Sequence, residues 1–227
     1  MGAPPKQIIA IEWSANFAYA IGLITSDGSL SRGSFRVNFG SKEMEMMKNF
    51  QMALGLSNAI SKHARGGEIE KRFFYTSFKS KAFYTYLLNV GLMPAKSKIM
   101  QSVAIPDEFF PDFLRGLFDG DGTFYTSWDK RWPSSFVFKT SFASASPTFI
   151  YWLKDRLTKL YGLKGYIHKG AGVLNLEYTK RDSKKLFEVM YYSANILFLH
   201  RKYDKMKTAI EYDMDLHARK QKNAAVA

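Results

Sequence analysis

A nine-residue pattern occurs twice in this chain, as AIGLITSDG at residues 20–28 and as LRGLFDGDG at residues 114–122. Each copy has Gly at its third position, a small residue at its seventh and Asp-Gly at its end. In a helix, the third and seventh positions share one face, so the backbone of a second helix can approach closely there. The repetition predicts two equivalent halves whose motif helices pack together and end at Asp27 and Asp121.

Packing of this kind would bring the Asp27 and Asp121 carboxylates together at one end of the helix pair. Paired carboxylates hold the divalent ions that stabilise the attacking water and the leaving oxygen in phosphodiester hydrolysis. A single Asp-Gly pair is more often only a turn after a helix. Because the two copies match, we favour a metal site. Asp119 has Thr25 as its counterpart, so we expect it to serve local packing or the helix end.

Residue types narrow the choice of metal. The chain has no Cys, and its four His are scattered without metal-ligand spacing, which leaves oxygen ligands and a hard cation such as Mg²⁺. An EF-hand loop starting at Asp119 is excluded, because Phe124 stands where that loop needs Gly and Lys130 where it needs Glu.

These residues resemble the single-chain, two-repeat LAGLIDADG homing endonucleases. The string IPDEFFPDFLRGLFDGDGTF at residues 105–124 is a close match, whereas the first copy departs at Ala20, Thr25 and Ser26. In that family the last acid of the motif carries the chemistry, so the resemblance assigns catalysis to Asp27 and Asp121. It covers nearly the whole chain, because a similar order of segments follows each motif.

The resemblance also implies a cofactor. Two or more Mg²⁺ ions are expected at the motif-helix ends, bound by Asp27 and Asp121 and faced by the backbone carbonyls of Ser26 and Gly120. Calcium is expected to support DNA binding without cleavage.

Family members further place basic residues beside the metals, from the segment after the last helix of each repeat. The matching segments are residues 96–98 and 200–202. We choose Lys98 and Lys202 as the catalytic pair, with Lys96 and Arg201 as substitutes. Their task would be to stabilise the charge that develops on the phosphate.

Periodicity after each motif predicts the rest of the fold. Polar and apolar residues alternate from Ser34 to Phe39, which predicts a strand. The other elements expected in the first half are helices at 42–54 and 82–90 and strands at 59–63 and 71–78. In the second half we expect a hairpin at 124–141, a helix at 147–161, strands at 165–168 and 173–179, a helix around 186–190 and a basic helix to about residue 215. The fold class is therefore α+β, with two pseudo-symmetric αββαββα repeats packed through the motif helices. We place them at 8–95 and 112–216, with a linker at 96–111 and a disordered tail at 217–227.

Charge indicates the partner. The chain has 33 Lys and Arg against 20 Asp and Glu, a net charge of +13, which favours a polyanion. Each repeat should present an antiparallel sheet, and the two sheets should form a saddle over double-stranded DNA. By alternation, the residues expected to contact DNA are Ser34, Arg36, Asn38, Arg72, Lys139, Asn175, Glu177 and Thr179. The second hairpin, longer by about eleven residues, should project furthest.

The leading hypothesis is a monomeric, intron-encoded endonuclease that makes double-strand breaks in a long, pseudo-palindromic target. Two alternatives stay open on the same fold: an RNA-binding intron maturase and a DNA-binding regulator that does not cut. An intein is disfavoured because the chain has no Cys and no splicing blocks. Without a membrane-span pattern or a signal peptide, we expect an intracellular protein, in a prokaryotic cytoplasm or nucleoid or in an organelle matrix.

Overall fold

The computed structural model describes residues 9–64, 73–133 and 135–226. Its first repeat runs through α1 (Ala15–Ser26), β1 (Gly28–Ser31), β2 (Arg36–Ser41), α2 (Met44–Leu54), β3 (Ser61–His63), β4 (Phe73–Lys79) and α3 (Lys81–Asn89). The short 3₁₀ helices η1 (Lys96–Lys98) and η2 (Asp107–Phe109) follow. Gly55 ends α2 in the left-handed conformation, as expected of a glycine C-cap.

The second repeat has the same order. It consists of α4 (Phe110–Asp121), β5 (Thr123–Trp128), β6 (Phe136–Ser144), α5 (Pro147–Tyr161), β7 (Tyr166–Lys169), β8 (Leu174–Tyr178) and α6 (Lys180–Met190), followed by α7 (His200–Val226). The predicted α+β class and the αββαββα repeats are confirmed. Helix α7 continues to Val226, well beyond residue 215, where the sequence pattern placed its end.

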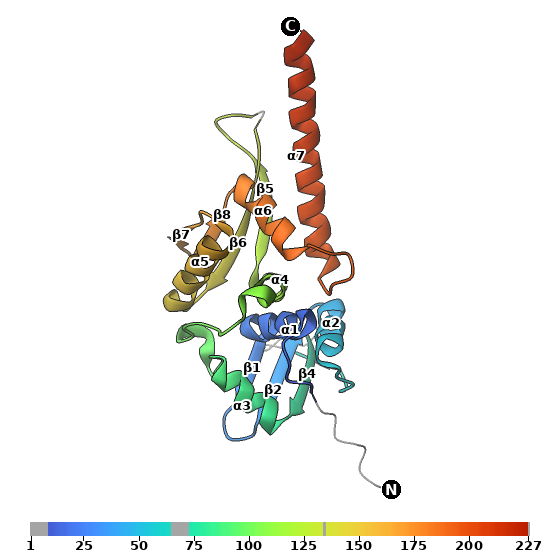
Figure 1. The fold of residues 1–227 in the computed structure, drawn as a ribbon, viewed down its shortest axis with the longest axis vertical. Helices are drawn as coiled ribbons and strands as arrows, with labels where there is room; N and C mark the ends of the chain where they lie inside the picture. Colours follow the sequence, from blue (N-terminus) through green and yellow to red (C-terminus); the bar gives the residue numbers. More distant parts are fainter. Residues whose placement is uncertain (1–8, 65–72, 134, 227) are drawn as a thin grey trace.

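Helices α1 and α4 lie side by side at the centre of the molecule, between the two sheets (Figure 1). The backbones meet at glycine: a Cβ on Gly22 would lie 2.9 Å from the Gly116 Cα, and one on Gly116 would lie 2.1 Å from the Tyr19 carbonyl oxygen. Any side chain at these positions would separate the helices. The close approach predicted from the repeated small residues is therefore present.

Within the described residues the strands form two four-stranded antiparallel sheets, ordered β1-β2-β4-β3 and β5-β6-β8-β7. In the first sheet, Val37 and Phe39 are buried, while Arg36 and Asn38 lie on the opposite face with Tyr75 and Ser77, their neighbours on β4. Helices α2 and α3 cover the inner face, and α5 and α6 cover that of the second sheet. Each sheet therefore keeps one polar outer face.

Two predicted strand residues are not in strands. Ser34 lies in the turn between β1 and β2, because Phe35 adopts a positive φ of 49° and β2 begins at Arg36. Thr179 is the N-cap of α6, whose first turn follows directly on β8. In both cases the alternation extended past the point where the backbone turns.

The β5–β6 hairpin projects from the second sheet alongside α7 (Figure 1). Helix α2 begins 17 residues after Asp27 (44 minus 27) and α5 begins 26 after Asp121 (147 minus 121). The second hairpin is therefore nine residues longer, not eleven. Tyr212 on α7 packs edge-on against Trp128 and Phe136 of the hairpin, with ring centroids 6.3 and 5.0 Å away, so α7 supports the projecting strands.

Candidate functional site

The two motif acids lie at the C-terminal ends of the paired helices. Asp27 is the C-cap of α1, and Asp121 is the last residue of α4. A Cβ on Gly120, the residue before Asp121, would lie 2.7 Å from Oδ2 of Asp27. The Asp27 carboxylate of the first repeat therefore reaches the backbone that carries the acid of the second. Both acids are solvent-exposed, so the pair opens outward.

Lys96 lies under the end of α1. Its side chain is buried, and its Nζ donates to the carbonyl oxygen of Gly28 at 2.6 Å, with the Ser26 carbonyl at 3.5 Å. The 3₁₀ turn of η1 brings it there from the linker between the repeats.

Lys202, in the first turn of α7, does the same for α4. It is buried, and its Nζ donates at 2.6, 3.0 and 2.6 Å to the carbonyl oxygens of Phe118, Gly120 and Gly122. Gly120 and Gly122 match Ser26 and Gly28 in the repeated motif. The two lysines therefore occupy equivalent positions, one in each repeat.

The structure brings Lys96 to the acids in place of Lys98, the residue preferred from the sequence. Lys98 is exposed, because the single turn of η1 directs neighbouring side chains differently and only Lys96 faces inward. Arg201, the substitute considered for Lys202, instead donates to Glu43 at 2.6 Å. This partly exposed ion pair joins the start of α7 to the N-cap residue of α2 in the first repeat.

Burial sets the electrostatics of the site. Desolvation lowers the pKa of Lys96, against the opposing charges of Asp121 and Asp27. It lowers the pKa of Lys202 to about 8, against Asp119. The pKa of Asp121 is raised by desolvation, although Lys96 and Lys202 oppose the rise. Two buried ammonium groups and two exposed carboxylates thus share one small region, and burial of the lysines strengthens their interaction with the acids.

The donor set suits a hard divalent ion. It consists of oxygen atoms, namely the Asp27 and Asp121 carboxylates and the carbonyls of Ser26 and Gly120, which already accept from the two lysines. Nowhere in the described residues do three or more His, Asp or Glu side chains cluster as metal ligands. A bound ion would therefore take its remaining ligands from water and substrate, as Mg²⁺ commonly does at phosphate sites.

Asp119 has the packing role expected of it. It is buried between the repeats, where it accepts from the Tyr19 hydroxyl at 2.7 Å and from the Leu199 backbone N–H at 2.8 Å. Desolvation raises its pKa to about 6. Asp119 therefore connects α1, α4 and the segment that leads into Lys202.

The outer face of the first sheet carries Arg36 and Asn38. Arg36 is exposed and donates to the Ser77 hydroxyl at 3.3 Å. Asn38 accepts from Tyr75 at 2.6 Å and from Ser77 at 2.9 Å, and it donates toward Ser29 and Ser31. Asn38 thus organises its neighbours, while Arg36 extends from the face. Ser34 lies in the turn, and Arg72 is outside the described residues.

The outer face of the second sheet is built around Glu177. This carboxylate is nearly buried and accepts from Tyr125 at 2.6 Å, from Lys139 at 3.0 Å and from Tyr166. These bonds hold the pKa of Glu177 below its usual range, although burial opposes the shift. Lys139 is therefore held within the sheet. Asn175 is half-buried and Thr179 is exposed beyond the strand.

Known structures share this architecture. The meganuclease I-AabMI bound to uncleaved DNA has a TM-score of 0.62 and 11% identity, covering 89% of this chain and 92% of that one. I-DmoI with DNA and Mn gives 0.52 and 18%, covering 79% and 97%. The N-terminal LAGLIDADG domain of DUF199/WhiA gives 0.53 and 14%, covering 87% and 90%. Among curated proteins the sequence has no significant match.

At family level, residues 112–201 match the LAGLIDADG-like domain. The second repeat therefore carries a LAGLIDADG-like domain, and the fold of the chain is that of the two-repeat LAGLIDADG structures. The resemblance predicted from the sequence is confirmed, since 89% of the chain aligns with the fold of the meganuclease I-AabMI and residues 112–201 match the family domain. No helix in the described parts of the chain is both long and apolar enough to span a membrane.

Proposed function

We propose that this chain is a site-specific, divalent-metal-dependent DNA endonuclease that acts as a monomer. The observation that carries the proposal is the duplicated site, in which each repeat contributes one motif-end acid and one buried lysine. Two such sets would allow one hydrolysis on each strand of a duplex. The net charge of +13 and the exposed Arg36 suit a phosphate-rich partner.

In this proposal Asp27 and Asp121 would hold Mg²⁺, which supplies charge stabilisation to the attacking water and the leaving oxygen. Lys96 and Lys202 add fixed positive charge behind the acids, at the helix ends where unpaired carbonyls make the local potential negative. The two outer sheet faces would contact the major groove on either side of the cut. The chain therefore needs no His base.

A DNA-binding regulator on the same fold is the second candidate, because the fold is also shared by the N-terminal LAGLIDADG domain of DUF199/WhiA. The two acids favour cleavage, since binding alone gives no reason to keep a carboxylate at both motif ends. The test is selection of cleaved sites from a randomised duplex library with Mg²⁺. Library molecules that bind but are never cut would favour the regulator, and preferential binding of structured intron RNA would favour a maturase.

Replacement of either acid gives the matched test. We expect Asp27→Asn and Asp121→Asn each to abolish double-strand cleavage while binding of the selected duplex survives, because an amide binds Mg²⁺ poorly but leaves the helix end and the sheets in place. Asp155→Asn, at an exposed acid on α5, is the control and should cut like the parent. Calcium should permit binding without cleavage. Full cleavage by either motif variant would contradict the assignment.

A further inference from the structure

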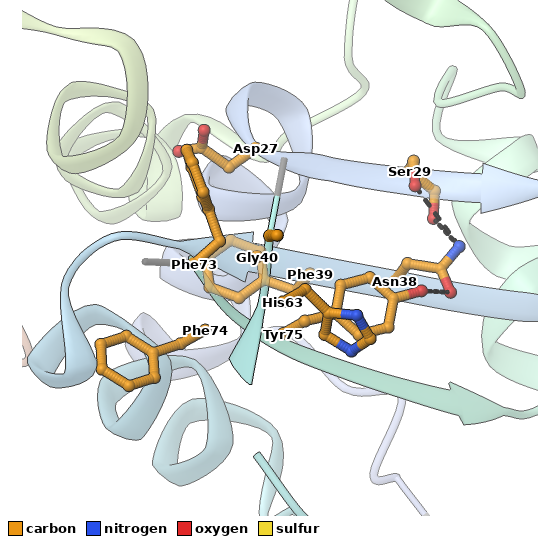
Figure 2. A pocket seen from close by; sticks show the side chains of 10 residues that line it. Asp27, Ser29, Asn38, Phe39, Gly40, His63, Phe73, Phe74 and Tyr75 are labelled. Carbon is orange, nitrogen blue, oxygen red and sulfur yellow. Dashed lines mark hydrogen bonds between the residues drawn. The ribbon is translucent and has the colours of Figure 1, made fainter. Parts of the chain in front are cut away.

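The outer face of the first sheet contains a hollow of about 320 Å³ beside Asp27. Figure 2 shows Gly40 at the centre of this hollow, with Phe73 rising between Gly40 and the Asp27 carboxylate and with Tyr75 and His63 on the far side. Because Gly40 has no side chain, the sheet surface is open there. The volume is at the lower end of the range for small-molecule sites, roughly 300–1,000 Å³, and suits one ring system.

The rings of Phe73, Tyr75 and His63 form an aromatic wall along this hollow, and neighbouring side chains hold Tyr75 and His63 in place. The Tyr75 hydroxyl donates to Asn38 at 2.6 Å, and the ring of His63 meets Tyr75 edge-on with centroids 5.0 Å apart. His63 also pairs with the Ser61 hydroxyl at 2.9 Å. These contacts fix the rings before any ligand arrives, so a planar partner would not have to order them.

The second sheet has no counterpart to this wall. In both repeats a Ser hydroxyl accepts from the backbone N–H two residues later, Ser41 from Glu43 at 3.0 Å and Ser144 from Ser146 at 3.1 Å. This shared turn makes Gly40 equivalent to Ala143, which pairs with Asn175 where Gly40 pairs with Tyr75. Val173 then takes the place of Phe73. An aromatic hollow at this position is thus a feature of the first half alone.

Its surroundings indicate the occupant. The exposed Lys42 ammonium lies 5.1 Å from the centre of the Phe73 ring, and Arg36 lies along the same strand face. A cation beside an aromatic hollow, next to an acid of the proposed cleavage centre, suits a nucleotide. The base would stack in the hollow and its phosphate would pair with Lys42. A neutral metabolite would make no charge interaction with Lys42.

We propose that this hollow receives one nucleobase that leaves the stack of the bound duplex beside the scissile phosphate on the first-repeat side. The inference rests on the proposed endonuclease function and adds a base-specific contact to it. The base would stack against Phe73 and Tyr75 and would hydrogen-bond to the Ser29 hydroxyl at the rim. These contacts would offset the free-energy cost of unstacking and unpairing the base. Because the second sheet lacks the wall, only one half-site would present a base in this way.

An abasic-site scan tests the proposal. In the selected duplex, with Ca²⁺, an abasic analogue replaces in turn the partner of each central base, which removes the pairing cost of extruding that base. We expect parent protein to bind one of these duplexes about tenfold or more tightly than the intact duplex. Gly40→Leu fills the hollow and should lose that gain. A Cβ there would lie 3.2 Å from the Phe74 carbonyl oxygen, which needs a local shift of the neighbouring strand, so circular dichroism checks that the variant folds.

Phe73→Leu and Phe73→Tyr form the second pair of variants. The first removes the stacking ring and should lose the gain, whereas the second keeps the ring and should retain it. If an abasic site raised affinity only through the flexibility of the DNA, the parent and Gly40→Leu would gain affinity equally, and that result would overturn the base pocket. The proposal would also be overturned if no abasic duplex bound the parent more tightly than the intact duplex. A chain that cuts its target without such a gain retains the proposed function. A chain that binds no duplex would overturn both.

Discussion

At the scale of single residues, each buried lysine completes a motif helix. The last carbonyls of a helix have no partner within it. Lys202 donates to three carbonyl oxygens at the end of α4, and Lys96 donates to the backbone at the end of α1. A positive charge also opposes the negative end of the helix dipole. The same ammonium groups therefore orient the backbone that carries the acids and supply positive charge beside them.

We predict that Lys96→Met and Lys202→Met each lower the cleavage rate about 100-fold or more, because a fixed charge that stabilises the transition state is lost. Methionine keeps most of the buried volume. Lys98→Met is the matched control, since that side chain is exposed two residues from Lys96, and it should stay within a few-fold of parent. The measurement is single-turnover cleavage of the selected duplex at equal folded protein. A larger loss in Lys98→Met would restore the choice made from the sequence.

The residue scale also shows how far sequence alone leads. Asp27 and Asp121 were placed correctly at paired helix ends, because repetition marks them. The sequence could not distinguish Lys96 from Lys98 as the counterpart of Lys202. Lys96 follows Asp27 by 69 residues (96 minus 27) and Lys98 by 71 (98 minus 27), whereas Lys202 follows Asp121 by 81 (202 minus 121). Because the two hairpins differ in length, the spacing does not decide between the two lysines. The inward direction of Lys96 depends on one 3₁₀ turn.

At the scale of elements, contact between α1 and α4 fixes the separation of the acids. We predict that Gly116→Ala destabilises the fold by about 1–3 kcal/mol through overpacking, because the new Cβ would meet the Tyr19 carbonyl oxygen at 2.1 Å. Cleavage should fall by more than stability explains, since the helix ends move apart. Gly40→Ala is the control for stability only, because its Cβ would meet the nearest atom at 3.2 Å and Gly40 lies in the proposed base pocket. Denaturant unfolding compares the two variants, and cleavage by Gly116→Ala is compared with the parent. A Gly116→Ala protein as stable and as active as the parent would refute the close packing.

The second sheet supplies a prediction about pH. Hydrogen bonds from Tyr125, Tyr166 and Lys139 hold the pKa of Glu177 below its usual value of 4.5, although burial opposes the shift. A lowered folded-state pKa gives stability that is present above pH 4.5 and is lost as the pH falls through the folded value. Glu177→Gln should therefore cost about 1–3 kcal/mol at pH 7 and flatten the loss of stability below pH 4.5.

Glu188→Gln, at an exposed acid on α6, is the control for this comparison. Its unfolding free energy should follow the parent at every pH. If Glu177→Gln shows the same acid dependence as the parent, the Glu177 cluster does not contribute to the stability of the sheet.

At the scale of the whole molecule, duplication made the architecture predictable. Matching orders of periodic segments gave two αββαββα repeats, and both sheets and the central helix pair are as expected. The turn at Phe35 and the length of α7 were not predicted. A positive φ at a Phe has no strong signal in the sequence. The last eleven residues of α7, LHARKQKNAAV, carry no apolar stripe that would mark them as a helix.

The two halves should differ in how they contact DNA. By the shared turn, Arg36 and Lys139 are equivalent, but Arg36 is exposed while Lys139 is held by Glu177 and Tyr166. We predict that Arg36→Ala weakens binding by about 1–3 kcal/mol and relaxes base preference at one position of one half-site. Lys139→Ala should have a smaller effect, in the other half-site. The measurement is affinity for every single-base variant of the selected target. A uniform loss for Arg36→Ala would instead make it a phosphate contact, with a salt dependence reduced by roughly one unit of slope.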